Sequence, residues 1–375
     1  MKLIKYVFLL IFAGSYGQHI SIDDASVTKE ELVEGLLDNS CVQITNIEQS
    51  DKEAVAYFNN NAGDFPISDG VIIRSGKAKL TEGPYSGKNL STVINATGDK
   101  DLQAINNASG QSTEISDVAF LAFEFIPLSE KFSFDFIFAS NEYGQWQCAS
   151  SDVFAFLLTE VATGETKNIA VLPGTDIPVS VRTIKDHRFN ENCESDNPEF
   201  FDSYQVGAAN SVVNMRGYTR LLTASATIKP GKKYRIKLVI GDSHDANYDS
   251  AIFIAGGSFR TDLDLGADRM LCEGSLTRLN TGLESPVYQH QWFKDEVAIP
   301  NGNNYFLDVN EPGDYMVKVT KNDSSCDISD QIRVERLAYN DLPDIVVCDN
   351  GVPEQLFDLT NNGYEKLGVS SEQYD

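Results

Sequence analysis

The sequence predicts a mostly β protein built from at least two domains. Short runs rich in Val, Ile, Phe, Tyr and Thr recur between clusters of Gly, Pro, Asn and Asp, whereas helical periodicity is rare. The strongest strand is Phe132–Ala139, where phenylalanine occupies every second position and so forms one apolar face. A chain of 375 residues also exceeds the usual size of a single domain.

The excess of acidic over basic residues limits the kinds of molecule that the protein can bind. The chain carries 55 acidic and 30 basic residues, which gives a formal net charge of -25. Such a surplus would repel a phosphate backbone, so we exclude a nucleic-acid partner. It favours an exterior that is soluble or binds cations.

Residues 1–17 predict a secretory signal peptide. Lys2 and Lys5 precede or border the apolar run Tyr6–Ala13, and small residues lead to a cut before Gln18. The run is shorter than the ~20 apolar residues of a membrane helix, and no later segment reaches that length. We therefore expect a secreted or cell-surface chain without a membrane span after cleavage, in which disulfides are permitted.

The region before the central strands begins with a short helix. Thr28 and Glu31 form a capping box, which predicts a helix ending near Asp38. The following segments are, in chain order, a strand at Cys41–Ile47, an Asn-rich loop at Tyr57–Asp69, a strand at Gly70–Arg74 and a turn-rich polar region at Ser75–Gly110.

Two hairpins are expected in the middle of the chain. Val118–Pro127 is apolar on both faces, and the short turn before Phe132–Ala139 predicts that these two strands pair. Leu221–Ile228 and Tyr234–Ile240 flank a tight turn and predict a second hairpin. Further strands are predicted at Val153–Leu158, Ile169–Leu172, Val179–Ile184 and Ala251–Phe259.

Acidic side chains gather where the central strands end. Glu142 follows the phenylalanine-rich strand, and Asp152 precedes the next one. A second loop, between two later core strands, carries four oxygen-bearing side chains: Asp242, Asp245, Asn247 and Asp249. Carboxylates this close repel one another by roughly 1 kcal/mol per pair at about 4 Å in water, and by more when they are partly buried.

A calcium ion would remove this repulsion, because it takes about six to eight oxygen ligands. The spacing of Asp245, Asn247 and Asp249 resembles the opening of an EF-hand loop. Ser250 replaces the required Gly, however, and Gly256 stands where the bidentate Glu belongs, so this is not an EF-hand. If the two loops meet at one end of a sandwich, the predicted Ca²⁺ ligands are Glu142, Asp152, Asp242, Asp245, Asn247 and Asp249. A hydrogen-bonded turn network without metal is the alternative.

The six cysteines allow many disulfide pairings, so their spacing alone does not fix the connectivity. The favoured pairs join cysteines of the same candidate domain: Cys148 with Cys193, and Cys272 with Cys326. The first bridge would fasten the long polar loop Asp186–Phe201 beside the acidic cluster. Cys41 and Cys348 remain unassigned.

Other site chemistries have little support in the sequence. The four His residues are scattered without zinc-ligand spacing, and the Gly-x-Ser-x-Gly, His-Glu-x-x-His and phosphate-binding glycine motifs are absent. Glu142, Asp152 and Asp242 could pair as glycosidase carboxylates, which leaves a glycan-active hydrolase as an alternative. Our expectation is a protein that is not an enzyme.

The central part of the chain resembles a known family. The resemblance rests on the stretches FDFIFASNEYGQWQCASSDVFAFLL, IAVLPGT and GYTRLLTASATIKPGKKYRIKLVIGDSHDANYDSAIFIAGGSF. In this order they are similar to the choice-of-anchor L domain of bacterial surface proteins, over residues 22–260. The resemblance implies a secreted, β-rich extracellular module of the kind joined to variable C-terminal anchors in Bacteroidetes. We expect it to fold as a β-sandwich or jelly roll.

Residues 264–336 resemble an Ig-like or PKD-like domain, which is a smaller β-sandwich. This likeness rests on Cys272, Trp292, the turn at Pro312–Tyr315 and Cys326. It implies that Trp292 is buried beside a disulfide between the sheets. Residues 341–375 look like the start of a further module that is cut short.

The leading hypothesis is therefore a non-catalytic adhesion or structural protein of the cell surface, stabilised by calcium. Its partner would be a surface glycan or protein. A carbohydrate-binding module is the first alternative, in which Tyr143, Trp146 and Tyr248 form stacking platforms near the acidic loops. The glycan-active hydrolase is the further alternative.

Overall fold

The computed structural model describes residues 19–336, except 38–40, 62, 95, 97, 112, 150, 244–246, 273, 285 and 323–326. The predicted signal peptide (1–17) and truncated module (341–375) lie outside the described residues. The described part is mostly β, which confirms the predicted fold class.

Two compact units make up this part of the chain. The N-terminal unit contains the residues up to Asp264, together with Thr281–Tyr288 and Thr320–Ile328. The C-terminal unit contains Leu265–Asn280, Gln289–Val319 and the residues from Ser329 onward. Each unit is described separately below.

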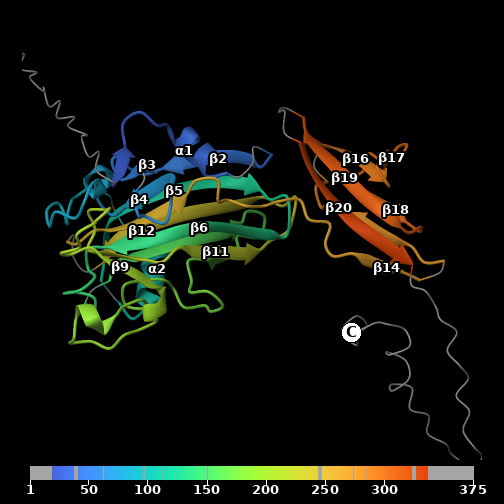
Figure 1. The fold of residues 1–375 in the computed structure, drawn as a ribbon. Helices are drawn as coiled ribbons and strands as arrows, with labels where there is room; N and C mark the ends of the chain where they lie inside the picture. Colours follow the sequence, from blue (N-terminus) through green and yellow to red (C-terminus); the bar gives the residue numbers. More distant parts are fainter. Residues whose placement is uncertain are drawn as a thin grey trace, which may run out of the picture. The chain divides into compact units, whose positions relative to one another are not determined.

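Two antiparallel sheets form the N-terminal unit (Figure 1). The first has the order β1 (Ile20–Asp23), β3 (Val55–Asn60), β4 (Asp69–Arg74), β13 (Ser250–Ala255), β6 (Lys131–Ser140), β10 (Gly217–Thr219) and β9 (Phe201–Tyr204), and β11 (Leu222–Thr227) also pairs with β6. The second has the order β2 (Gln43–Gln49), β5 (Ile115–Ile126), β12 (Tyr234–Ser243), β7 (Val153–Glu160) and β8 (Thr166–Asn168).

Phenylalanine side chains fill the space between the two sheets. Phe134 and Phe136 of β6 lie 4.9 and 4.8 Å from the ring of Phe156 on β7. Phe138 stacks on Phe154 at 4.8 Å. The period-two face predicted for Phe132–Ala139 is therefore the inner face of a β-sandwich.

The outer faces of both sheets are also covered. On the second sheet, α2 (Lys100–Ala108) packs Leu102 against an apolar cluster that includes Val153, Leu157 and Val239. On the first sheet, Ile137 of β6 packs with loop residues such as Met215. Each sheet is thus covered on its outer face as well as on the inner face that packs against the other sheet.

The remaining helical segments are short. The helix α1 (Lys29–Leu36) begins at the predicted capping box, in which the Thr28 hydroxyl accepts from the Glu31 amide and the Glu31 carboxylate accepts from Thr28. The 3₁₀ turns are η1 (Ala78–Thr81), η2 (His187–Phe189) and η3 (Pro198–Phe200). In the part of the chain that the structure describes, no helix is long and apolar enough to cross a membrane.

Both predicted hairpins are wrong. The strands β5 and β6 follow each other in the chain but lie in different sheets, and so do β11 and β12. The reason is that β5 and β6 both carry apolar inner faces, and these faces cover each other across the sandwich, where Phe125 and Phe132 lie 4.9 Å apart. If β5 and β6 paired in one hairpin, these rings would lie side by side on one face of the same sheet. Another element would then have to cover that face.

Three local predictions also differ from the structure. The strand β3 begins before and ends within the predicted Asn-rich loop 57–69, and α2 lies inside the predicted turn-rich region, capped by the Asp99 carboxylate. The predicted strands Ile169–Leu172 and Val179–Ile184 belong to the segment between β8 and β9, which forms two isolated bridges, Val171 with Pro178 and Lys185 with Asp196.

The regular elements in the described part of the C-terminal unit are all strands. One sheet has the order β14 (Arg269–Leu271), β20 (Asp327–Arg336), β19 (Gly313–Lys321), β16 (Tyr288–Lys294) and β17 (Val297–Ala298), and β15 (Thr277–Asn280) pairs with β18 (Phe306–Val309). Trp292 of β16 is buried, and its indole N–H donates to the carbonyl of Asn304 at 2.8 Å.

Burial of His290 makes the stability of the C-terminal unit depend on pH. Burial lowers the pKa of His290 from 6.5 to about 4. Since the folded state disfavours the proton, the stabilisation is complete above pH ~6.5 and is lost as the pH falls through ~4. After allowance for solvent screening, we expect a loss of roughly 1–2 kcal/mol.

Denaturant unfolding at about pH 7 and about pH 4.5 measures this loss. Trp292 fluorescence in a Trp146→Phe background reports the C-terminal unit alone, because the chain has two tryptophans. His290→Gln should reduce the pH dependence, whereas His187→Gln, at an exposed position of the N-terminal unit, should not. A His290→Gln variant with the wild-type pH dependence would contradict the assignment.

Candidate functional site

The two acidic loops meet at one rim of the sandwich. Ser140 at the end of β6 pairs with Ser250 at the start of β13, and their hydroxyls are 2.9 Å apart. The amide of Asn141 donates to the carbonyl of Asp249 at 3.2 Å. The loop that follows β6 and the loop that precedes β13 are therefore joined directly.

The second sheet contributes two carboxylates to the same rim. Asp152 immediately precedes β7, and Asp242 lies near the end of β12. The amide of Asp152 donates to Glu142 at 2.8 Å, and the amide of Ser243 donates to Asp152 at 3.3 Å. These contacts connect the ends of the two sheets.

Four of the six predicted calcium ligands are thus brought together and buried. The exposed fraction is at most 2% for each of Glu142, Asp152, Asp242 and Asp249. Asn247 is exposed, and Asp245 lies outside the described residues.

Asp249 is neutralised by an arginine that the sequence analysis did not identify. Arg74 is fully buried, and its Nε lies 3.0 Å from Asp249 Oδ2. The same guanidinium donates to Thr81 Oγ1 and to the carbonyl of Asn89. The Asp249 carboxylate also accepts from the amide and the hydroxyl of Thr92, at 2.9 and 2.6 Å. The only sequence signal was an arginine as the last residue of a largely apolar strand.

A glycine allows this ion pair to form. A Cβ at position 76 would lie 1.9 Å from Asp249 Oδ2 and 2.3 Å from Thr92 Oγ1. Since both atoms belong to the hydrogen-bonded network, neither can move away without loss of a contact. Gly76 is therefore required by the close approach of the backbone.

The remaining carboxylates are not neutralised in this way. Among the described residues, neither oxygen of Asp242 and only one oxygen of Asp152 has a hydrogen-bond partner. Burial raises the pKa of Asp242 well above its usual range, and the charge of Asp249 raises it further, while the nearby Ser75 hydroxyl offsets this only in part. Burial and the charge of Glu142 likewise raise the pKa of Asp152.

The arrangement therefore needs a proton or a cation. A buried, unpaired carboxylate is costly, so its charge is normally removed or compensated. Within the described residues, no three His, Cys, Asp or Glu side chains are arranged to hold a metal by themselves. A cation at this rim would take part of its oxygen shell from main-chain carbonyls or water.

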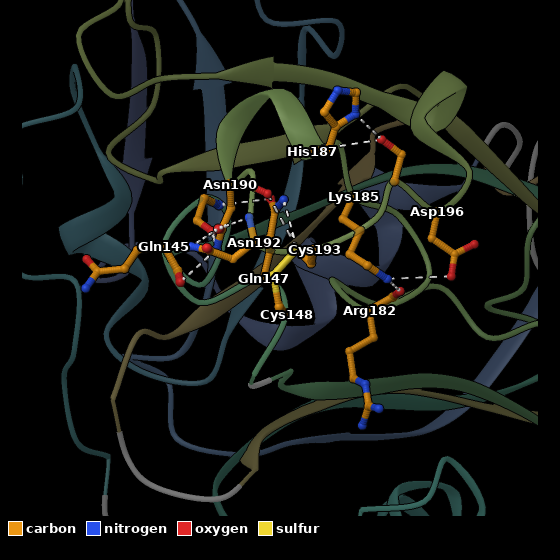
Figure 2. The surroundings of a disulfide bond; sticks show 12 residues. Gln145, Gln147, Cys148, Arg182, Lys185, His187, Asn190, Asn192, Cys193 and Asp196 are labelled. Atoms are coloured by element: carbon orange, nitrogen blue, oxygen red, sulfur yellow. Dashed lines mark hydrogen bonds and ion pairs between the residues drawn. A yellow bond between two sulfur atoms is a disulfide. The ribbon is translucent and has the colours of Figure 1, made fainter.

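The predicted disulfide between Cys148 and Cys193 is present, with a Cα–Cα distance of 5.8 Å (Figure 2). Polar contacts reinforce it: the Asn190 amide group donates to the carbonyls of Gly144 and Gln145, and the Gln147 amide group donates to the carbonyl of Asp186 at 2.8 Å. The long polar loop is therefore fastened to the segment that follows β6.

The predicted pairing of Cys272 with Cys326 is wrong. Cys272 is an exposed free thiol just after the short strand β14, whereas Cys41, which the sequence left unassigned, is disulfide-bonded. Cys326 itself lies outside the described residues. The prediction failed because it assumed that disulfides stay within one candidate domain, which spacing alone does not establish.

The three predicted stacking aromatics do not form one platform. Tyr143 is fully buried against Phe138 and Phe201, so it is core rather than surface. Trp146 and Tyr248 are half-buried, with ring centroids 5.7 Å apart.

An arginine completes this smaller aromatic patch. The Arg216 guanidinium lies 5.7 Å from the ring centre of Tyr248. Two N–H groups, Trp146 Nε1 and Arg216 Nη1, have no hydrogen-bond partner among the described residues. Both N–H groups are themselves buried, so the patch, defined here as Trp146, Arg216 and Tyr248, presents ring faces and part of a guanidinium rather than free N–H donors.

The carboxylates do not form a glycosidase pair. Glu142 and Asp242 are buried, and of the three candidates Asp152 alone borders a described pocket. A glycosidic bond needs two carboxyl groups facing it from opposite sides. The described residues give no such pair.

Comparison with known families identifies a match over most of the N-terminal unit. Residues 21–260, well over half of the chain, match the family model described as the Choice-of-anchor L domain. No curated protein matches the chain.

One solved structure shows only a weak similarity. The crystal structure of the adhesin domain of Epf from Streptococcus pyogenes aligns with 59% of this chain and 74% of that chain, at 10% identity. The TM-score is 0.19, so this likeness supports no argument about fold or function.

Removal of the buried guanidinium tests the role of Arg74. Arg74→Met leaves the Asp249 carboxylate buried and unpaired, so we expect a loss of about 3–5 kcal/mol in unfolding free energy. Denaturant unfolding measures it, and adding Asp249→Asn should restore part of the loss. The control Arg235→Met removes a partly exposed pair with Glu48 and should cost less than about 1 kcal/mol. Equal losses in the two variants would argue against a special role for Arg74.

Proposed function

The chain belongs to the choice-of-anchor L domain family, and from this premise we propose that it is a secreted or cell-surface module with an adhesive or structural role. The N-terminal unit carries the family match, and its buried sandwich is a rigid platform for exposed loops. The role proposed is non-catalytic, because all three candidate carboxylates are buried and only Asp152 borders a described pocket. This also weighs against the glycan-active hydrolase.

A calcium ion at the rim is the second part of the proposal. The observation that carries it is the Asp242 carboxylate, which is fully buried and has no hydrogen-bond partner among the described residues. Glu142 and Asp152 act electrostatically on the same position. All of these are oxygen donors, which hard cations such as Ca²⁺ prefer.

The C-terminal unit would act as an Ig-like or PKD-like spacer. Its support is the buried Trp292, held by an indole hydrogen bond within a small all-β unit. Such a spacer would present the N-terminal unit away from its point of attachment.

A carbohydrate-binding role is the second candidate. The aromatic patch supports it, because sugars stack on aromatic faces, and the rings of Trp146 and Tyr248 are half-buried neighbours. The left-handed backbone of Tyr248, with a φ of 64°, is uncommon for a bulky residue and holds the ring next to Trp146.

Calcium should raise the melting temperature of the wild-type protein and EDTA should lower it. At calcium concentrations ~100-fold above Kd the stabilisation is about 2.7 kcal/mol, or about 5–10 °C for a unit of this size. Asp242→Asn should abolish the response, and its metal-free protein should be at least as stable as the metal-free wild type, since a neutral amide replaces a buried charge.

The matched control is Asp51→Asn, which changes an exposed carboxylate and should keep the full calcium response. Scanning calorimetry with calcium, magnesium and EDTA measures all three proteins. A wild-type melting temperature that is the same in calcium and EDTA would remove the metal from the proposal and leave the surface role intact.

Truncation of the aromatic patch tests the second candidate. Trp146→Ala should lower the affinity for any glycan identified on an array by at least about tenfold, because a central Trp commonly dominates a binding surface. Tyr305→Ala, which removes half of an aromatic pair in the C-terminal unit, should leave the affinity unchanged. An array without hits would argue against glycan recognition by the patch.

A further inference from the structure

A large groove in the N-terminal unit lies beside the fastened loop. Its volume is about 690 Å³, within the usual range for small-ligand sites. A second hollow of about 260 Å³ adjoins it, and the two share Lys167, Val171 and Asp176. Together they suit an extended ligand rather than a compact one.

Four parts of the fold form the walls of the groove. The end of α2 and the start of β7 supply apolar side chains such as Ile105 and Val153. The edge strand β8 supplies Lys167 and Asn168, and the loop of residues 171–196 closes the far side. The floor is thus built on two regular elements of the rigid sandwich.

The loop wall is fixed in place. The backbones of Lys185 and Asp196 exchange two hydrogen bonds, at 2.9 and 3.0 Å, and the Lys185 ammonium also caps the carbonyl of Arg182. The Cys148–Cys193 disulfide fastens the same loop three residues earlier (Figure 2). Because this wall is already ordered, less conformational entropy is lost when a ligand binds.

Two basic side chains that have no ion-pair partner among the described residues line the groove, although the chain as a whole is strongly acidic. The lining contains three basic residues, Lys167, Arg182 and Lys185, and three acidic ones, the exposed Asp176 and Asp196 and the buried Asp152. Lys185 lies 3.6 Å from Asp196, but neither Lys167 nor Arg182 has an ion-pair partner within the described ranges. Figure 2 shows Arg182 extending away from the disulfide and from this ion pair.

A free oxygen of Asp152 completes the lining. Asp152 is 1% exposed, and its Oδ2 has no hydrogen-bond partner among the described residues. Whether a proton or a cation compensates this carboxyl, it does not present a bare negative charge to the groove. The oxygen is itself buried, so recognition of a ligand falls to the exposed side chains of the groove.

We propose that this groove binds an acidic saccharide whose carboxylates pair with Arg182 and Lys167. A guanidinium forms bidentate hydrogen bonds with a carboxylate, and Lys167 stands where the two hollows meet, so consecutive acidic sugars would each find a cation. Asn168 and the apolar wall would contact the hydroxyls and faces of the rings. This site is separate from the aromatic patch, and neither Arg182 nor Lys167 is among the proposed calcium ligands.

Titration calorimetry with two sugars of equal length tests the proposal. Trigalacturonate carries a carboxylate on each ring, whereas maltotriose is neutral. The wild type should bind trigalacturonate, more weakly as salt is added, and should not bind maltotriose measurably. Arg182→Gln should lower the affinity for trigalacturonate by about tenfold, and the double variant with Lys167→Gln should lower it further.

Matched controls are Lys52→Gln and Lys232→Gln, which remove exposed cations that do not line either hollow and should keep the wild-type affinity. Melting temperatures of all variants check that the fold is unchanged. No binding of trigalacturonate, equal binding of maltotriose, or wild-type affinity in the double variant would each overturn the proposal.

Running the titrations in EDTA separates this proposal from the calcium site. Binding that persists in EDTA supports recognition by the basic side chains even if calcium has no effect on melting. Binding that requires calcium would overturn the assignment to Arg182 and Lys167.

Discussion

The phenylalanine layer between the two sheets is the constraint on which the other features depend. Once Phe134, Phe136 and Phe138 pack against β7, the end of β6 and the start of β7 lie at the same rim. The loops that leave those ends carry the acidic residues and the disulfide. The carboxylates are buried because the sandwich that positions them is tightly packed, and their electrostatic cost follows from that packing.

The fold was predictable where the signal is local. The period-two pattern of β6 and the capping box of α1 depend on neighbouring residues, and both are present in the structure. Strand pairing was not predictable in the same way, because a short connection permits either a hairpin or a crossing to the facing sheet. The choice depends on which faces cover each other, and this information lies in residues distant in the sequence, such as Phe125 and Phe132.

The candidate site was predictable only in outline. Polar loops at the ends of buried strands indicated that Glu142 and Asp249 would lie near each other, since strand ends gather at the rim of a sheet. The burial of these carboxylates and the presence of Arg74 could not be inferred, because an arginine at the end of an apolar strand is normally exposed. The groove beside β8 was missed for a related reason, because its wall was interpreted as two strands.

The Cys148–Cys193 bridge also has a mechanical consequence. It closes a loop of 45 residues that contains β7, a strand of the sandwich core. When tension is applied between the ends of the chain, the segment inside the disulfide loop cannot extend. The extension gained on unfolding is therefore shorter by roughly 150 Å. A module attached to a cell and pulled by its surroundings would therefore yield in shorter steps than its chain length suggests, and β7 would remain covalently tethered after the sheets separate.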